Sequence, residues 1–169
     1  KGFDLHLIAT NSKLLHEVKT ELESKYDTSV SVYSCDFTSE GQIEKLQSDL
    51  KNQITSLDVL INNTGAFEFG SVEESSVQQL KKLLDINVLG AYSVTSVFLP
   101  LFKKQKKGHV FNIGSIVTEI PREDVSAYTI SKFALKGFTE VLRNELVSSK
   151  VKVTEIIPGS INTSSWDGV

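Results

Sequence analysis

Short apolar runs alternate with longer amphipathic segments along this chain, and this alternation restricts the possible folds more than any other feature. Five runs rich in Val, Ile and Leu predict strands, at 5–9, 30–35, 57–61, 109–113 and 151–157. Helical spacing of apolar residues predicts helices between them, at 14–25, 38–54, 75–104 and 128–146. The pattern predicts an α/β fold, a doubly wound parallel sheet in three layers, within one domain covering 1–169.

Composition excludes several classes of partner. The 169 residues are 40% apolar and 23% charged with a net charge of −3, so neither nucleic acid nor an anionic membrane is an expected partner. The basic run 103–107 is interpreted as a helix C-terminus, with Gly108 as the stop. Cys35 is the single cysteine, which favours a reducing compartment and a cytoplasmic location. No His, Cys or carboxylate spacing indicates a metal site.

Polar residues follow each predicted strand. They are Thr10 and Asn11, Asp36, Asn62 and Asn63, Ser115, and Ser160. In open parallel sheets, ligands bind beyond the carboxyl ends of the strands. These residues are therefore candidates for one binding region.

Tyr128 and Lys132 lie four residues apart on a predicted helix, and so on one face of it. A cation beside a phenol favours the phenolate, so we expect Lys132 to lower the pKa of Tyr128. Ser115 lies thirteen residues before Tyr128 and adds a hydroxyl. The pair alone is also typical of a solvated helix face, and Ser115 alone of a loop cap. The neighbouring motifs decide between these interpretations.

Five blocks, in order, together resemble the short-chain dehydrogenase/reductase family over nearly the whole chain. The blocks are Asp36 after a strand, the turn Asn62-Asn63-Thr64-Gly65, Asn87 within a helix, Ser115 with Tyr128 and Lys132, and the segment from Pro158 to Thr163. The resemblance implies a Rossmann-type fold. It also implies an oxidoreductase that passes a hydride between a nicotinamide cofactor and a carbonyl or alcohol carbon.

The resemblance also implies a role for each catalytic residue. Tyr128 would be the general acid for reduction and the general base for oxidation. Lys132 would supply the nearby cation and bind the nicotinamide ribose, and Ser115 would orient the substrate oxygen. Asn87 would bend its helix and hold a water that connects Lys132 to solvent. An isolated Asn in this apolar helix segment is otherwise unfavourable.

Cofactor contacts carry over in the same way. The family's cofactor-binding positions correspond here to Asp36, Phe37, Asn63, Thr64, Gly65, Tyr128, Lys132, Pro158, Gly159, Ile161 and Thr163. Thr64 departs from the usual Ala of the family. Thr10 and Asn11, at the end of the first strand, are added as cofactor-binding candidates. With Lys13 they include no carboxylate to repel a 2′-phosphate, which favours NADP, although NAD remains possible.

The family begins with a strand and a Gly-rich turn that this sequence does not contain. We therefore expect the chain to be part of a longer protein, incomplete at both ends. Without that central strand, the sheet would be divided and would expose edges.

Two functional hypotheses remain open. One is an NADP-favouring carbonyl reductase or alcohol dehydrogenase, acting on a small carbonyl or alcohol substrate as a homodimer or homotetramer. The other is a catalytically silent NAD(P)-binding sensor or scaffold on the same fold. Apolar Ile116, Val117 and Ile120 are expected to border the substrate pocket and to favour some hydrocarbon surface.

Overall fold

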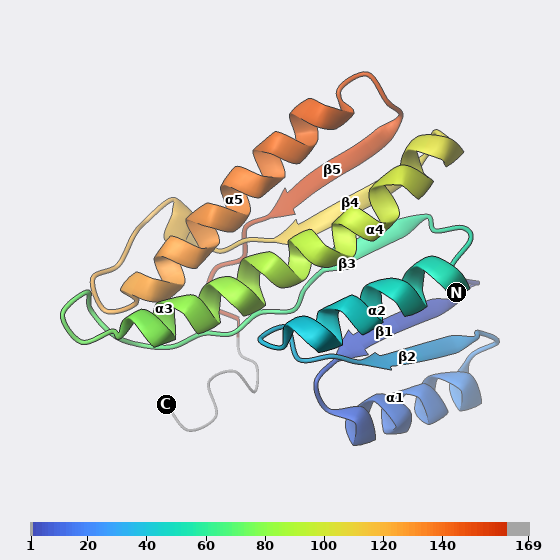
Figure 1. Ribbon diagram of the computed structural model, residues 1–169, viewed down its shortest axis with the longest axis horizontal. Coiled ribbons are helices and arrows are strands. Elements are labelled where there is room, and N and C mark those ends of the chain that lie inside the picture. Colours follow the sequence, from blue (N-terminus) through green and yellow to red (C-terminus); the bar gives the residue numbers. More distant parts are fainter. Residues whose placement is uncertain (1, 162–169) are drawn as a thin grey trace. The chain divides into compact units, whose positions relative to one another are not determined.

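The computed structural model describes residues 2–161, which fall into two compact units, 1–49 and 50–169. The first unit contains β1 (Leu5–Ala9), α1 (Ser12–Lys25), β2 (Val30–Ser34) and most of α2 (Glu40–Gln53). Strands β1 and β2 pair in parallel, from Leu5 opposite Val30 to Ala9 opposite Ser34 (Figure 1). The unit is therefore a small βαβα segment.

Helix α1 forms where the sequence supplies a cap and a partner strand. The side chain of Asn11 accepts a hydrogen bond from the Leu14 amide (3.0 Å) and so caps the helix. Lys19 donates to the Val30 carbonyl (2.6 Å), and Glu23 accepts from the Val30 amide (2.9 Å). These two bonds attach the polar side of α1 to the first residue of β2.

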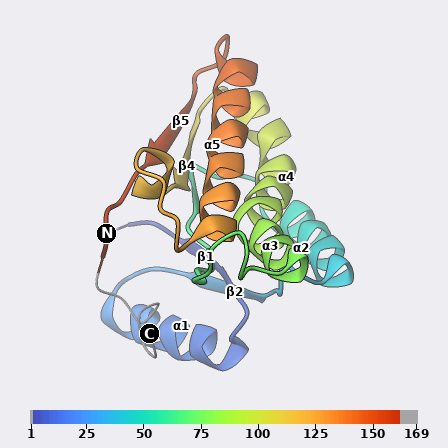
Figure 2. The same cartoon turned by 90° about the vertical axis from the view of Figure 1, so that its left-hand side faces the viewer.

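The second unit carries a three-stranded parallel sheet in the order β3-β4-β5. Its elements are β3 (Val59–Asn62), α3 (Val77–Leu84), the π-helical turn η1 (Asp85–Leu89), α4 (Gly90–Gln105), β4 (Gly108–Ile113), the 3₁₀ turn η2 (Ile116–Thr118), α5 (Ser126–Leu146) and β5 (Val151–Ile156). Helices α4 and α5 lie side by side over one face of this sheet (Figure 2). Val110 of β4, Phe98 of α4 and Leu142 of α5 are buried in the layer between these helices and the sheet.

The predicted α/β class is confirmed, with parallel strands alternating with helices. Among residues 2–161 the strands form two separate sheets, β1-β2 and β3-β4-β5. This agrees with the expectation that a chain without the central strand has a divided sheet. Each predicted strand and helix is present, with ends that differ by only a few residues.

Two local features were not predicted. The helix expected over 75–104 contains the π-helical turn Asp85–Leu89, and η2 follows β4 directly. The expected role of Gly108 as the helix stop is wrong. Helix α4 instead ends at Gln105, and its C-cap residue Lys106 takes the left-handed conformation (φ 54°). Gly108 begins β4.

Within the described part of the chain, one helical run, Val77–Gln105, is long and apolar enough to cross a membrane by length and composition alone. One such run is weak evidence for a membrane span, because core helices have the same composition. Here the run contributes Phe98 and Phe102 to the buried layer, and its Thr95 accepts a hydrogen bond from Asn62 (3.0 Å). We interpret it as a core helix.

Gly108 allows close contact between α4 and β4. Its φ is +150°, and a Cβ atom built there would lie 2.2 Å from Cδ1 of the fully buried Phe102. We therefore expect Gly108→Ala to lower the free energy of unfolding by about 2–4 kcal/mol, because both the backbone and the aromatic ring must move. Urea unfolding followed by circular dichroism measures the change.

The control is Gly137→Ala in α5, where a Cβ would meet nothing within 4 Å. Alanine is the better helix former, so this variant should gain about 0.5–1 kcal/mol. Equal stabilities of the two variants would contradict the packing described for Gly108.

Candidate active site

Helix α5 places Tyr128 and Lys132 on one face, as predicted. Tyr128 is half-buried, whereas Lys132 is only 5% exposed. The Lys132 Nζ lies 5.7 Å from the centroid of the Tyr128 ring. It donates its hydrogen bond to the carbonyl of Ile113, the last residue of β4 (2.9 Å). The ammonium is thus close to the phenol ring and anchored to the sheet.

Ser115 lies where β4 ends and contacts the same tyrosine. Its Oγ accepts from the Val117 amide at 3.4 Å, which caps η2. A side-chain hydrogen bond between Ser115 and Tyr128 favours the phenolate and acts to lower the pKa of Tyr128. Ser115 therefore both caps a turn and pairs with the phenol. The two interpretations of this residue are compatible.

The expected lowering of the tyrosine pKa is wrong for this structure. Burial raises the pKa of Tyr128 above its usual 10, and this effect outweighs the Ser115 hydrogen bond. Burial also lowers the pKa of Lys132 from 10.5 to about 8, while the charge of Glu155 acts in the opposite direction. Desolvation disfavours both charged forms and is the largest cause of both shifts.

Asn87 is 1% exposed and lies in the π-helical turn. Its Oδ1 accepts from the Ala66 amide (2.7 Å), and its Nδ2 donates to the Ala66 carbonyl (3.0 Å) and to Ser131 Oγ (2.8 Å). The expected distortion of the helix at Asn87 is present. The side chain joins the loop after β3 to α5, and both of its N–H groups are used. The water that Asn87 was expected to hold stays a prediction.

Ser131 completes this connection and was missed by sequence reasoning. It is fully buried, accepts from Asn87, and donates to the Tyr128 carbonyl (2.7 Å). Its position three residues after Tyr128 places it on the same helix face, which was the available signal. The pair Asn87–Ser131 therefore fixes the first turn of α5, which carries the phenol.

The turn after β3 passes directly over these groups. A Cβ atom on Gly65 would lie 3.4 Å from Asn87 Oδ1 and 3.7 Å from Lys132 Nζ. Asn63 and Thr64 are exposed. The absence of a side chain at Gly65 leaves open backbone beside the Lys132 ammonium.

Phe67 is a second residue that the sequence did not reveal. Its ring meets the Tyr128 ring edge-to-face, with centroids 4.9 Å apart. Of the three expected pocket residues, Ile116 and Ile120 are 37% and 66% exposed, but Val117 is only 6% exposed. The expectation for Val117 is therefore wrong, because its side chain packs inward.

The loop after β5 lies against the loop after β4. The Pro158 carbonyl accepts from the Ile116 amide (3.0 Å), and the Ile156 carbonyl accepts from the Gly114 amide (2.8 Å). Gly159 and Ile161 follow in exposed backbone, and Thr163 lies outside the described residues. Pro158 is thereby held next to the segment that carries Ser115.

The remaining candidates belong to the first unit. Asn11 is occupied in capping α1, and Thr10 is exposed. Oδ1 of Asp36 accepts from the Thr38 amide (2.9 Å) and hydroxyl (2.8 Å), which lowers the pKa of Asp36. Phe37 is buried in the core, so its backbone is the part available to a ligand.

The second unit therefore holds a phenol, a hydroxyl and an ammonium around the carboxyl end of β4. This arrangement can bind an oxygen atom through Ser115 and exchange a proton with it through Tyr128. Among residues 2–161, no group of His, Cys, Asp and Glu could hold a metal ion. The chemistry available in this unit is proton transfer next to a cation.

Comparisons with known proteins agree with this arrangement. The family model described as short chain dehydrogenase matches residues 1–168. An NADP-dependent 3-hydroxy acid dehydrogenase from Schizosaccharomyces pombe is 32% identical over 160 residues, which cover 94% of this chain. The mouse dehydrogenase/reductase SDR family member 7B is 32% identical over 166 residues, covering 96% of this chain.

Solved structures match the fold. A short-chain dehydrogenase from Streptomyces avermitilis has a TM-score of 0.86 at 27% identity and covers 96% of this chain and 59% of its own. A short-chain dehydrogenase from Sphingobium yanoikuyae in complex with NADPH has a TM-score of 0.90 at 23% identity, with 98% and 65% covered.

The chain spans only part of its relatives, 62% of the Schizosaccharomyces pombe protein and 51% of the mouse protein. It is partial relative to these homologues, as the sequence predicted. The match itself extends over nearly all of the chain, and it includes both the segment from Ser115 to Lys132 and the strand-end residues. The chain belongs to the short-chain dehydrogenase family of oxidoreductases.

Proposed function

We propose that this protein is an oxidoreductase that interconverts a carbonyl and an alcohol with a nicotinamide cofactor, NADPH being favoured. The observation that carries the proposal is the proximity of Ser115, Tyr128 and Lys132 at the end of β4. Asn87 supports this arrangement through its hydrogen bond to Ser131 of α5. Helix α5 carries Tyr128 and Lys132, Ser115 follows the end of β4, and Asn87 lies in η1, so each residue is held by or next to a rigid element. Such rigidity is what proton transfer to a positioned substrate requires.

In the reducing direction, Tyr128 supplies the proton. A nicotinamide cofactor, when bound, would supply the hydride that the carbonyl carbon accepts. Ser115 holds the carbonyl oxygen, and the Tyr128 O–H bond breaks as the proton passes to that oxygen. Because burial raises the pKa of Tyr128, the phenol is protonated at neutral pH and ready to donate. The Lys132 ammonium stabilises the phenolate that remains.

The residues present fit a nicotinamide cofactor. Gly65 leaves its backbone unobstructed beside Lys132, whose ammonium has further N–H groups besides the one bonded to Ile113. Within the second unit we assign cofactor contacts to Gly65 and Lys132, whereas Asp36 and Thr10 stay candidates predicted from the sequence. The NADP preference rests on Thr10, Asn11 and Lys13. The similarity to an NADP-dependent relative supports it.

The second candidate is a cofactor-binding sensor that performs no chemistry. The observation that favours it is the hydrogen bond of Lys132 to a backbone carbonyl. A sensor would bind NADPH without turnover on any carbonyl compound. The intact set of Ser115, Tyr128 and Lys132 favours the enzyme.

We also propose that the protein acts in the cytoplasm as a homodimer or homotetramer. The lone Cys35 is a buried free thiol, in keeping with a reducing compartment. Exposed apolar side chains on α4 and α5 support association through these helices; they include Tyr92, Ile130, Phe133 and Val141.

The first prediction concerns the proton donor. Tyr128→Phe keeps the ring but removes the hydroxyl, so kcat should fall by about 100-fold or more while NADPH binding changes little. Loss of NADPH absorbance with a panel of ketones and aldehydes measures kcat for the purified full-length protein. Tyr92→Phe, at an exposed tyrosine of α4, is the control. Full turnover in Tyr128→Phe rejects the mechanism, and binding without turnover in the wild type favours the sensor.

Lys132→Met should lower activity and increase stability. The buried ammonium is costly, so replacing it should raise the free energy of unfolding at pH 7 by about 1–3 kcal/mol and lower kcat by about 100-fold. The pKa of Lys132 is 10.5 in the unfolded chain and about 8 in the folded chain. The loss of folding stability caused by burying the charged lysine is therefore complete below pH 8, and it disappears as the pH rises to 10.5.

Urea unfolding at several pH values measures this difference. Lys104→Met, at an exposed lysine of α4, should change stability by less than about 0.5 kcal/mol at any of them. A stability gain from Lys132→Met that is independent of pH would show that ionisation is not its cause.

Thr10→Asp tests the cofactor preference. A carboxylate at the end of β1 repels a 2′-phosphate but can bind a ribose hydroxyl. The ratio of kcat/KM for NADPH to that for NADH should therefore fall by about 10-fold or more. Ser24→Asp adds the same charge near the C-terminus of α1 and should leave the ratio unchanged. A ratio unaltered by Thr10→Asp would refute the assignment of Thr10.

A further inference from the structure

Glu155 in β5 is a partly buried acidic group for which the proposed function has no role. Its Oε1 atom is buried and has no hydrogen-bond partner among the described residues. Removing a carboxylate oxygen from water without a partner is unfavourable. Some other interaction must therefore stabilise the charge at this position.

The surroundings of Glu155 are defined by the sheet. Glu155 pairs with Asn112, so their side chains share one face of the sheet. Asn112 donates to Thr139 Oγ1 of α5 (2.8 Å), which identifies this face as the one that α5 covers. A Cβ atom on Gly114 would lie only 2.7 Å from Glu155 Oε1. The carboxylate therefore fills the space that Gly114 leaves by having no side chain.

The Lys132 side chain extends from α5 to the same end of β4. Its Nζ donates to the Ile113 carbonyl, which belongs to the peptide unit joining Ile113 to Gly114. The ammonium and the carboxylate thus approach a single peptide unit on the same face of the sheet. Their attraction acts across a largely buried region, where charges interact more strongly than in water.

We propose that Glu155 is the counter-charge of Lys132, a positioning residue that keeps the ammonium charged beside Tyr128. The proposal rests on the proposed function for its catalytic consequence, but the pairing itself does not depend on it. Glu155 acts through Lys132 and touches neither the phenol nor the substrate oxygen. Gly114 is needed because any side chain there would displace the carboxylate.

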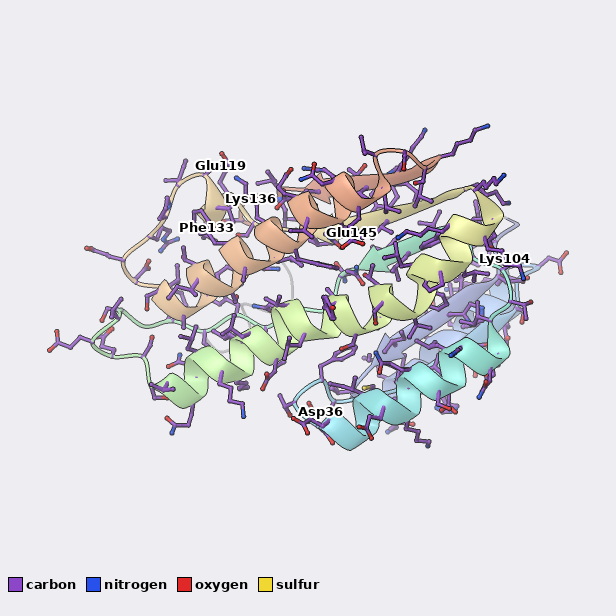
Figure 3. All side chains as sticks on the ribbon, turned by 45° about the horizontal axis from the view of Figure 1, so that its top comes forward. Asp36, Lys104, Glu119, Phe133, Lys136 and Glu145 are labelled. Atoms are coloured by element: carbon purple, nitrogen blue, oxygen red, sulfur yellow. The ribbon has the colours of Figure 1, made fainter. Side chains whose placement is uncertain are left out.

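The other charges near this face have partners of their own. Glu119 forms an ion pair with Lys136 (2.6 Å), and both residues are labelled in Figure 3. Glu140 is paired with Arg143 on α5. Among the described residues, Glu155 is the one charge that shifts the pKa of Lys132, and it raises that pKa against the effect of burial. The charge of Glu155 also raises the pKa of Lys136, but less than the charge of Glu119 does.

Glu155→Gln keeps the shape of the side chain and removes its charge. The pKa of Lys132 should then fall by about half a unit to one unit below that of the wild type. Titration of the full-length protein labelled with ¹³C at lysine Cε measures it by NMR, with Lys132→Met assigning the signal. Glu155→Asp should restore most of the wild-type value, and Glu140→Gln should not change it.

The same variants should shift the pH profile of activity. Reduction needs a charged Lys132, so the alkaline limb of kcat should move to lower pH in Glu155→Gln by the same amount. Gly114→Ala should move it in the same direction. A purely structural role would lower kcat equally at every pH, which would overturn the proposal.

The two measurements separate this proposal from the proposed function. If the Lys132 signal shifts while no carbonyl compound is reduced, the pairing holds and the enzymatic function fails. If turnover is normal and the Lys132 signal is the same in Glu155→Gln as in the wild type, the enzyme stands and the pairing is refuted.

Discussion

The hydrogen bonds of the Asn87 side chain are the interaction on which the arrangement of the site depends. They connect the π-helical turn to the Ala66 backbone on one side and to Ser131 on the other. Ser131 in turn holds the Tyr128 carbonyl. A fully buried amide that used fewer of its hydrogen-bonding groups would be costly, so these bonds are expected to form together or not at all. The turn over Lys132 and the first turn of α5 are thereby kept in one geometry.

Burial and charge oppose each other in this site. Desolvation raises the pKa of Tyr128 and lowers the pKa of Lys132, so it favours two neutral groups. Ser115 favours the phenolate, and Glu155 favours the ammonium. The proposed chemistry needs a proton on the phenol before transfer and a cation beside the phenolate afterwards. The role inferred for Glu155 is to preserve that cation in spite of its burial.

Local patterns predicted most of this structure, because they report on properties that lie within a few residues. The apolar runs located the strands, and the helical spacing of apolar residues located α1. The spacing of Tyr128 and Lys132 placed them on one helix face. The π-helical turn, the inward packing of Val117 and the raised pKa of Tyr128 depend on contacts between distant segments. Glu155 was missed for the same reason, since its proximity to Lys132 arises only when β5 pairs with β4.

The central claim is that this site transfers a hydride to a carbonyl carbon while Tyr128 supplies the proton. The most direct measurement uses NADPH in which both hydrogens at the nicotinamide C4 position are replaced by deuterium, the full-length protein and a ketone that it reduces. Mass spectrometry of the alcohol then reports the fate of the label. The account predicts one deuterium on the carbinol carbon and a hydroxyl proton that comes from solvent. An alcohol without deuterium, or no alcohol from any ketone in spite of NADPH binding, would contradict it.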